Sequence, residues 1–239
     1  MGGSRKNLIM IISHKFKFIF IKTIKTAGTS IEIALSKFCG PKDIITPISQ
    51  EDEEIRHALG YRGSQNYLTP FLDYTRQDWA ELLRKGKRSK RFYNHMSAQE
   101  IKPLLDQSIW DNYYKFCFVR NPWDRLISLY YYSYQSEPRP TITEFLTTKY
   151  PLLLRRRGYD LYTINGKVVV DRICRYEDLS EELETIRVKL GIPDKLELPK
   201  AKSGFRKDNR SYRDIINEEE KMKVNELCRE EIALTGYQF

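Results

Sequence analysis

The sequence predicts an α/β fold in which helices cover both faces of a central, mainly parallel sheet. Short aromatic and β-branched runs at residues 16–21, 114–119 and 172–177 alternate with segments of helical spacing. The chain of 239 residues is 41% hydrophobic, which is enough to bury a sizeable core. We expect residues 10–239 to form one domain and residues 1–9 to be derived from an expression vector or disordered.

The net charge of +9, from 41 Lys and Arg against 32 Asp and Glu, favours anionic partners. The acidic residues are interspersed, so a small polyanionic ligand explains this charge as well as nucleic acid does. The four cysteines form no C-x-x-C pair, which predicts a reducing compartment and no zinc site. Residues 8–21 are too short and too charged to span a bilayer. We therefore expect a cytoplasmic protein without a membrane partner.

The first strand is predicted at residues 16–21, FKFIFI, and it is followed by the loop KTAGTS at residues 25–30. Thr29 or Ser30 can cap the next helix, predicted over residues 31–38. The order is therefore strand, loop and helix.

A loop of this kind presents backbone N–H groups and the positive end of the helix dipole, so it binds phosphate or sulfate. Lys25 and the hydroxyl groups of Thr26, Thr29 and Ser30 add further donors. The pattern predicts an anion site. An ordinary capped helix with exposed lysines remains an equal alternative at this point.

Residues 41–75 contain several Pro and Gly residues and predict a long excursion, with at most a short helix at residues 51–59. Residues 77–85 predict another helix. The basic run at residues 85–91 is interpreted as a solvated connector.

His95 lies just before a predicted helix. Ser97 and Glu100 form a capping box, in which each side chain bonds to a backbone amide of the other residue, so the helix begins at Ser97. From its position alone, His95 is interpreted as a solvent-exposed loop residue.

The second strand, YKFCFV at residues 114–119, ends at Arg120. Asn121 is a good cap and Pro122 suits the first helical position, so a helix is predicted over residues 123–135. The planar guanidinium of Arg120 suits bidentate phosphate binding. Ser128, two helical turns on, can add a hydroxyl group.

The remaining elements are predicted from turn and capping signals. These are a capping box at residues 141–144, a hairpin at 161–170 around Asn165-Gly166, a strand at 172–177, a helix from Ser180 to Gly191, a basic loop at 200–213, a last helix from Asn217 and an apolar terminus at 237–239 that docks on the core.

Two cationic strand ends are thus expected at one edge of the sheet. A nucleoside triphosphatase needs the pattern G-x-x-x-x-G-K-[ST] and an acid that holds magnesium, whereas Lys25 here precedes the only glycine of its loop. This arrangement indicates two phosphate sites without magnesium between them, as a nucleotide with 5′ and 3′ phosphates requires.

The two loops resemble motifs of the sulfotransferases that use 3′-phosphoadenosine 5′-phosphosulfate (PAPS). KTAGTS at 25–30 is similar to the 5′-phosphosulfate loop, and FVRNPWDRLISLY at 118–130 is similar to the 3′-phosphate motif. The likeness to the carbohydrate-type, family 2-like branch runs through HMSAQEI at 95–101, RYEDL at 175–179 and the closing helix. Ile24 departs from the family, which usually has Pro before the lysine. The resemblance implies a three-layer P-loop-like fold.

The resemblance also implies the roles of the site residues. His95 is the general base that accepts a proton from a hydroxyl acceptor, expected to be a carbohydrate, and Lys25 stabilises the leaving phosphate. No metal and no nucleic acid take part. The residues implied to bind PAPS are Lys25, Thr26, Ala27, Gly28, Thr29, Ser30, Arg120 and Ser128, together with Lys202, Ser203 and Arg206 of a closing loop.

Two other functions stay open at this point. One is a P-loop-like kinase of nucleotides or small molecules, which a magnesium requirement would favour. The other is a non-catalytic module that binds polyanions through residues 85–91 and 200–213.

Overall fold

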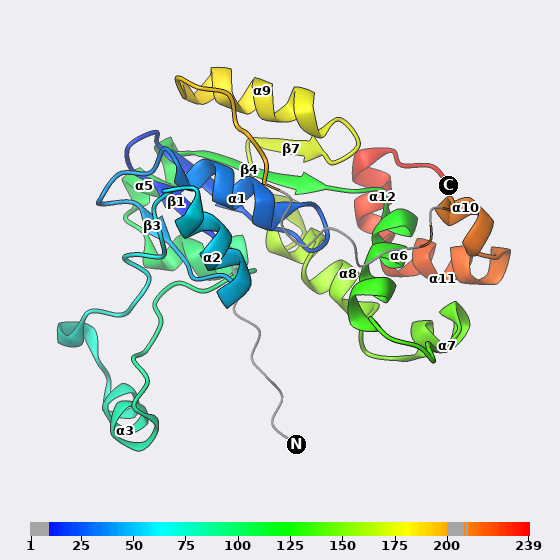
Figure 1. Ribbon diagram of the computed structural model, residues 1–239, viewed down its shortest axis with the longest axis horizontal. Helices are drawn as coiled ribbons and strands as arrows, with labels where there is room; N and C mark the ends of the chain where they lie inside the picture. The colour runs from blue at the N-terminus through cyan, green and yellow to red at the C-terminus, as the bar shows by residue number, and fades with distance from the viewer. Residues whose placement is uncertain (1–9, 200–207, 209) are drawn as a thin grey trace.

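The computed structural model describes residues 10–199, 208 and 210–239 (Figure 1). The proposed closing loop with Lys202, Ser203 and Arg206 lies outside the described residues, as do residues 1–9.

The fold is α/β, with a five-stranded mixed sheet flanked by helices. The strand order is β3 (Ile44–Ile45), β1 (Ile11–Ser13), β2 (Phe18–Ile21), β4 (Tyr114–Val119) and β7 (Arg172–Arg175). The three strands β2, β4 and β7 run parallel, as expected. Strand β1 is antiparallel to both of its neighbours, so the expectation of a mainly parallel sheet is corrected to a mixed one.

Strand β1 was not predicted, and a tight turn explains its direction. Only residues 14–17 separate β1 from β2, and a connection this short can join only antiparallel strands. Lys17 adopts a left-handed conformation with φ of 52°. The Asp43 carboxylate accepts hydrogen bonds from the amide of His14, at 2.7 Å, and from the hydroxyl of Ser13, at 2.8 Å.

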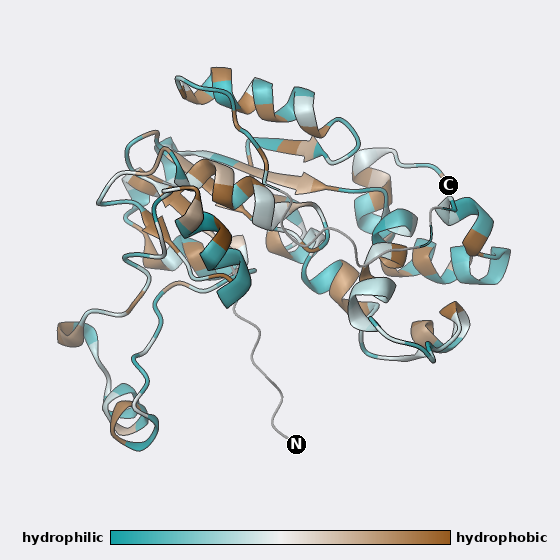
Figure 2. Ribbon diagram, in the orientation of Figure 1, coloured by the Kyte–Doolittle hydropathy of each residue, from teal (hydrophilic) through white to brown (hydrophobic). Residues whose placement is uncertain are grey.

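Alternate residues of the strands point to opposite faces of the sheet, and each face has its own core. On one face, Phe18, Phe20, Phe116 and Phe118 pack against α1 (Gly28–Ser36) and α9 (Leu179–Leu190). On the other face, buried residues of the same strands pack against α4 (Ala98–Ile101), α5 (Gln107–Asn112) and α6 (Pro122–Ser133). In Figure 2 hydrophobic colouring follows the sheet and the helix sides that cover it.

The other elements complete the chain. They are α2 (Gln50–Ala58), η1 (Phe71–Asp73), α3 (Arg76–Lys85), η2 (Lys102–Leu104), α7 (Ile142–Thr147), α8 (Leu152–Arg156), η3 (Tyr159–Leu161), β5 (Thr163–Ile164), β6 (Lys167–Val168), α10 (Tyr212–Ile215), α11 (Glu218–Leu227) and α12 (Arg229–Thr235).

Most predicted caps are confirmed, and two are wrong. Capping boxes stand at Ser97, Thr141 and Asn217. Helix α9 begins two residues earlier than predicted, with Asp178 as its N-cap, so Ser180 lies within the helix. Helix α1 begins at Gly28, and its N-cap is Ala27, which makes no side-chain cap bond.

The C-terminal segment docks on the body as predicted. Tyr237 is buried, and its hydroxyl donates to the Glu177 carboxylate at 2.6 Å. Helix α12 is also tied to α6, because the buried Arg125 guanidinium pairs with the buried Glu231 carboxylate. Among the described helices, none is long and apolar enough to cross a membrane. All four cysteines are buried and unbridged.

Candidate active site

The two predicted anion loops lie side by side at one edge of the sheet. Strands β2 and β4 are paired in parallel, with Ile21 opposite Cys117, so their carboxyl ends meet at the same edge. The Thr23 hydroxyl donates to the Phe118 carbonyl, which joins the chains just beyond the strands. One step further on, Arg120 Nη1 donates to the Lys25 carbonyl oxygen at 3.1 Å.

The first loop has a strained backbone. Lys25 and Ala27 both adopt left-handed conformations, with φ of 62° and 56°, which cost roughly 1–2 kcal/mol per residue outside glycine. Turns in which left-handed residues alternate with other conformations can point successive amides toward one side, and such a turn makes a concavity that suits an anion. The loop is anchored from outside, because the Ile24 amide donates to the Arg157 carbonyl at 2.7 Å.

Helix α1 adds its amino end to this concavity. Its first amides have no acceptor within the helix, and its first turn contains no acidic residue. The Thr26 hydroxyl faces inward and donates to the Thr23 carbonyl at 3.2 Å. The Thr29 hydroxyl accepts from Lys22 Nζ at 2.8 Å and keeps its own proton to donate. Ser30 is buried in the same turn.

Lys22 is a residue of this region that sequence reasoning missed. The residue is 6% exposed, and its side chain runs beneath the first turn of α1. A Cβ added at Gly28 would lie 2.5 Å from the Lys22 Cγ, so glycine is needed here to admit the lysine. A lysine at the end of a buried strand was the available signal, because a buried cation needs a partner.

That partner is Glu32, on the next turn of α1. Its carboxylate lies 3.7 Å from Lys22 Nζ and 3.4 Å from Arg56 Nη2 of α2, and all three side chains are buried. Burial disfavours the charged carboxylate and raises the pKa of Glu32 to about 7, while both cations act in the opposite direction. A charged cluster therefore lies directly behind the anion loop.

The second loop presents Arg120 and Ser128. The Arg120 guanidinium contacts Asp124 through Nε, at 2.8 Å, and lies over the Tyr176 ring at 4.3 Å. Asn121 caps α6 by accepting from the amides of Trp123 and Asp124, as predicted. Ser128 lies on α6, partly buried, two turns beyond Arg120.

The Lys25 side chain reaches toward the same helix. Its Nζ lies 4.1 Å from the centre of the Tyr132 ring, one turn beyond Ser128 on α6. A cation and an aromatic ring attract each other by about 0.5–2 kcal/mol. At the upper end of its own range, a charge-assisted hydrogen bond to an anion contributes more than this. The ammonium group therefore lies close to both loops.

His95 lies against the first loop. Its Nδ1 is 2.7 Å from the Lys22 carbonyl oxygen, and its backbone is left-handed with φ of 49°. A carbonyl only accepts hydrogen bonds, so Nδ1 must carry the proton and the lone pair of the neutral ring is on Nε2. His95 lies two residues before Ser97, which forms the predicted capping box with Glu100.

The other two histidines are elsewhere. His14 pairs with the Tyr113 hydroxyl at 2.8 Å beside the β1–β2 turn, and His57 is exposed on α2. In the described ranges no group of three or more His, Cys, Asp or Glu side chains could hold a metal ion.

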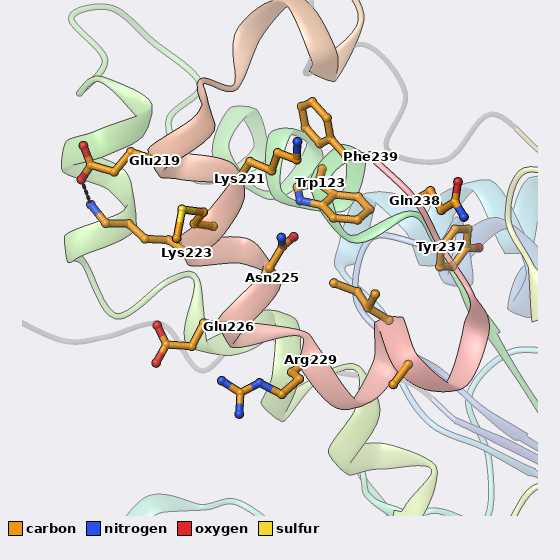
Figure 3. Close-up of a pocket in the computed structure, with 13 residues that line it drawn as sticks. Trp123, Glu219, Lys221, Lys223, Asn225, Glu226, Arg229, Tyr237, Gln238 and Phe239 are labelled. Atoms are coloured by element: carbon orange, nitrogen blue, oxygen red, sulfur yellow. Dashed lines mark hydrogen bonds and ion pairs between the residues drawn. The ribbon is translucent and has the colours of Figure 1, made fainter.

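A separate pocket of about 1050 Å³ lies between α11, α12 and the chain end (Figure 3). Trp123 lines it, together with charged residues of α11 such as Lys221 and Glu226. None of the predicted site residues belongs to its lining. The charged strand ends therefore define the candidate site, and this pocket does not.

The structure is an α/β fold in which two loops with cationic residues meet at the carboxyl ends of parallel strands, the edge at which such sheets bind ligands. The sequence profile of the sulfotransferase family matches residues 9–235, and the chain belongs to that family. This confirms the resemblance seen in the loop motifs.

The chain is also similar to an uncharacterized protein of Archaeoglobus fulgidus. The two are 32% identical over 108 residues, which cover 43% of this chain and 88% of the relative. No solved structure matches the chain significantly.

Proposed function

We propose that this protein transfers the sulfuryl group of PAPS to the hydroxyl group of an acceptor, a carbohydrate in the first instance. Residues 10–239 act as one sulfotransferase domain with a three-layer P-loop-like architecture. The observation that carries the proposal is the hydrogen bond from Arg120 to the Lys25 carbonyl, because it brings two cationic strand ends within reach of one nucleotide.

The residues present fit a nucleotide with phosphates at both ends. The 5′ side would be held by the amino end of α1 and its loop, in the set Lys25, Thr26, Ala27, Gly28, Thr29 and Ser30. The 3′ phosphate would be held by Arg120 and Ser128, with Lys202, Ser203 and Arg206 as the proposed closing residues. When bound, PAPS supplies an activated sulfuryl group and no metal is required.

His95 accepts the proton of the acceptor hydroxyl at Nε2. The hydrogen bond from Nδ1 to the Lys22 carbonyl fixes the ring and stabilises the positive charge that the imidazole gains. With an ordinary pKa near 6.5, a histidine is mostly neutral at physiological pH. The strained left-handed backbone of His95 supports a functional role for this position.

Lys25 stabilises the negative charge that grows on the oxygen between phosphate and sulfate. The Lys25 ammonium, 4.1 Å from the centre of the Tyr132 ring, would form a charge-assisted bond to this oxygen. The amides at the start of α1 also stabilise this negative charge.

The acceptor is proposed to lie beside residues 41–92, which lead into His95. The basic run at residues 85–91 favours an acceptor that carries negative charge. Carbohydrate remains a proposal that rests on the family branch seen in the sequence motifs.

The test is binding of adenosine 3′,5′-bisphosphate, the product of sulfuryl transfer, measured as a shift in melting temperature without magnesium. A ligand at about 100 times its Kd adds about 2.7 kcal/mol to the free energy of unfolding. We expect Arg120→Ala to remove most of this gain. Arg187→Ala is the control, because Arg187 is an arginine of α9 paired with Glu184 in an ordinary surface ion pair.

No shift in the parent protein would count against the proposal. A shift that depends on magnesium would favour the kinase alternative. Transfer of labelled sulfate from PAPS to a panel of acceptors then identifies the acceptor class.

A further inference from the structure

Residues 68–91 form an arm that leaves the body of the protein and returns to it (Figure 1). At its neck, the Thr69 amide donates to the Ser89 carbonyl at 3.0 Å, and the Arg91 amide donates to the Tyr67 carbonyl at 3.0 Å. The arm contains η1 and α3, and neither helix has a buried residue. The arm therefore contributes little to the core and exposes its side chains on a projecting element.

The arm has a defined internal structure. The Phe71 and Trp79 rings stack with centroids 5.9 Å apart, and the Tyr74 ring meets Trp79 edge-on at 5.1 Å. The Arg88 guanidinium lies 4.3 Å from the centre of the Phe71 ring. These contacts fix the relative positions of η1, α3 and the basic run.

The tip of the arm exposes apolar side chains to solvent. Leu72 is 99% exposed and Leu83 is 85% exposed, while Phe71 and Trp79 are close to half exposed. Trp79 and Leu83 are four residues apart and therefore share one face of α3. Figure 2 shows hydrophobic colour on η1 and on one side of α3. Apolar residues gathered on a projecting element mark a contact surface.

The charge of the arm selects the kind of partner. The arm has seven Lys and Arg residues against three Asp and Glu, a net charge of +4. A second copy of the chain would bring a like-charged arm, and a purely polar polyanion would leave the two leucines in water. Tryptophan and leucine flanked by basic residues are typical of elements that lie in the interface of an anionic bilayer.

We propose that the arm docks on the surface of a membrane that contains anionic lipid. Leu72 and Leu83 enter the boundary between headgroups and acyl chains, and Arg84, Lys85 and Lys87 contact the lipid phosphates. This inference does not require sulfuryl transfer, although it gives Lys85 and Lys87 of the basic run a lipid contact in place of an acceptor contact, and it departs from the sequence-based expectation of no membrane partner. Because His95 follows the neck residue Phe92 by three positions, docking holds the candidate site close to the membrane.

The test is co-sedimentation of the full chain with vesicles of phosphatidylcholine that contain about a third phosphatidylserine. Vesicles of phosphatidylcholine alone are the lipid control. We expect binding to the anionic vesicles only, with an affinity that falls as salt is raised, because headgroup contacts are screened. Equal binding to both kinds of vesicle, or none to either, would overturn the proposal.

The variant Leu72→Glu/Leu83→Glu separates apolar insertion from charge attraction. It should lower the affinity for anionic vesicles by tenfold or more, since two inserted leucines are lost and two negative charges are gained. The matched control is Val188→Glu/Met222→Glu, which changes the same net charge at apolar residues of α9 and α11 that are 62% and 68% exposed. The control should change the affinity less than threefold.

All four positions are exposed, so both variants should keep the parental melting temperature. Equal loss of vesicle binding in the two variants would show that net charge alone acts, and the arm would not be the docking element. Heparin is the alternative ligand. If heparin displaced the protein from the vesicles, and if Leu72→Glu/Leu83→Glu bound heparin as well as the parent does, the partner would be a soluble polyanion and membrane docking would be refuted.

Discussion

At the scale of single residues, the main finding is how His95 is oriented. The Lys22 carbonyl accepts from Nδ1, so the chemistry assigned to this ring depends on a backbone group of the anion loop. The proposed base and the proposed anion site are thus parts of one structural unit. A shift of the loop would move both.

The role of His95 is tested by His95→Asn, which keeps a side chain able to donate to the Lys22 carbonyl. We expect sulfuryl transfer to fall by about 10²–10⁴-fold, as for loss of a general base, while binding of adenosine 3′,5′-bisphosphate is kept. His57→Asn, at an exposed position of α2, is the control and should keep the parental rate. Parental activity in His95→Asn would refute the assignment.

Substitutions at two neighbouring residues of the loop should change the free energy of unfolding in opposite directions. Gly28→Ala places a Cβ about where the Lys22 side chain passes, 2.5 Å from its Cγ, and should cost about 1–3 kcal/mol of unfolding free energy. Ala27→Gly relieves a left-handed alanine and should be neutral or stabilising by up to about 1 kcal/mol. Urea denaturation of both variants measures this, and equal destabilisation would contradict the described loop.

At the scale of elements, α1 and α2 are joined behind the site by the buried cluster of Lys22, Glu32 and Arg56. Both helices therefore take part in positioning the loop, although only α1 touches it through its amino end. The cluster also makes this part of the fold sensitive to pH.

Glu32 has a pKa of about 7 in the folded protein against 4.5 in the unfolded chain. Between these values the folded state binds more protons, so this group's contribution to stability is greatest below pH 4.5 and falls as pH rises to 7. The loss amounts to about 3 kcal/mol. Glu32→Gln should remove this dependence of stability on pH. The measurement is the difference between the urea midpoints at pH 5 and above pH 7. An unchanged difference between the two midpoints would contradict it.

The ion pair of Arg125 and Glu231 ties α12 to α6 in the core, where Tyr162 also donates to Glu231 at 3.1 Å. Glu231→Leu leaves Arg125 charged and buried, and should cost about 3–5 kcal/mol. Glu230 is the adjacent control, since it pairs with Arg155 at the surface, and Glu230→Leu should cost less than about 1 kcal/mol. If thermal denaturation showed similar losses of stability in the two variants, the buried ion pair would contribute no more than the surface pair.

At the scale of the whole molecule, the sequence predicted the parts that depend on local signals. Strand β4 was predicted with its observed limits because the aromatic run YKFCFV and the cap at Asn121 are local features. Strand β1 was not predicted because its three residues form a strand only by pairing with β2 and β3, and its short connection to β2 then makes that pair antiparallel. The hydrogen bond from Lys22 to the Thr29 hydroxyl, which lies inside α1 and not at its cap, is also not encoded by a local pattern.

The candidate site was likewise predicted where its residues carry local signals, and it was missed where they do not. Lys25, Arg120 and His95 were found from strand ends, a capping box and family motifs, and the structure brings them to one edge of the sheet. Lys22 and Glu32 were not found, because their roles arise from burial between α1 and α2. Their functional roles, like those of the whole predicted set, remain predictions to be tested by binding and kinetics.

The central claim is that two loops hold opposite ends of one nucleotide. The most direct measurement is calorimetric titration of Lys25→Met and Arg120→Ala with adenosine 5′-monophosphate and adenosine 3′-monophosphate. Loss of a charge-assisted bond should weaken binding by about 10–100-fold. We predict that Lys25→Met loses affinity only for the 5′ nucleotide and Arg120→Ala only for the 3′ nucleotide. Equal weakening of both nucleotides by both variants would contradict the claim.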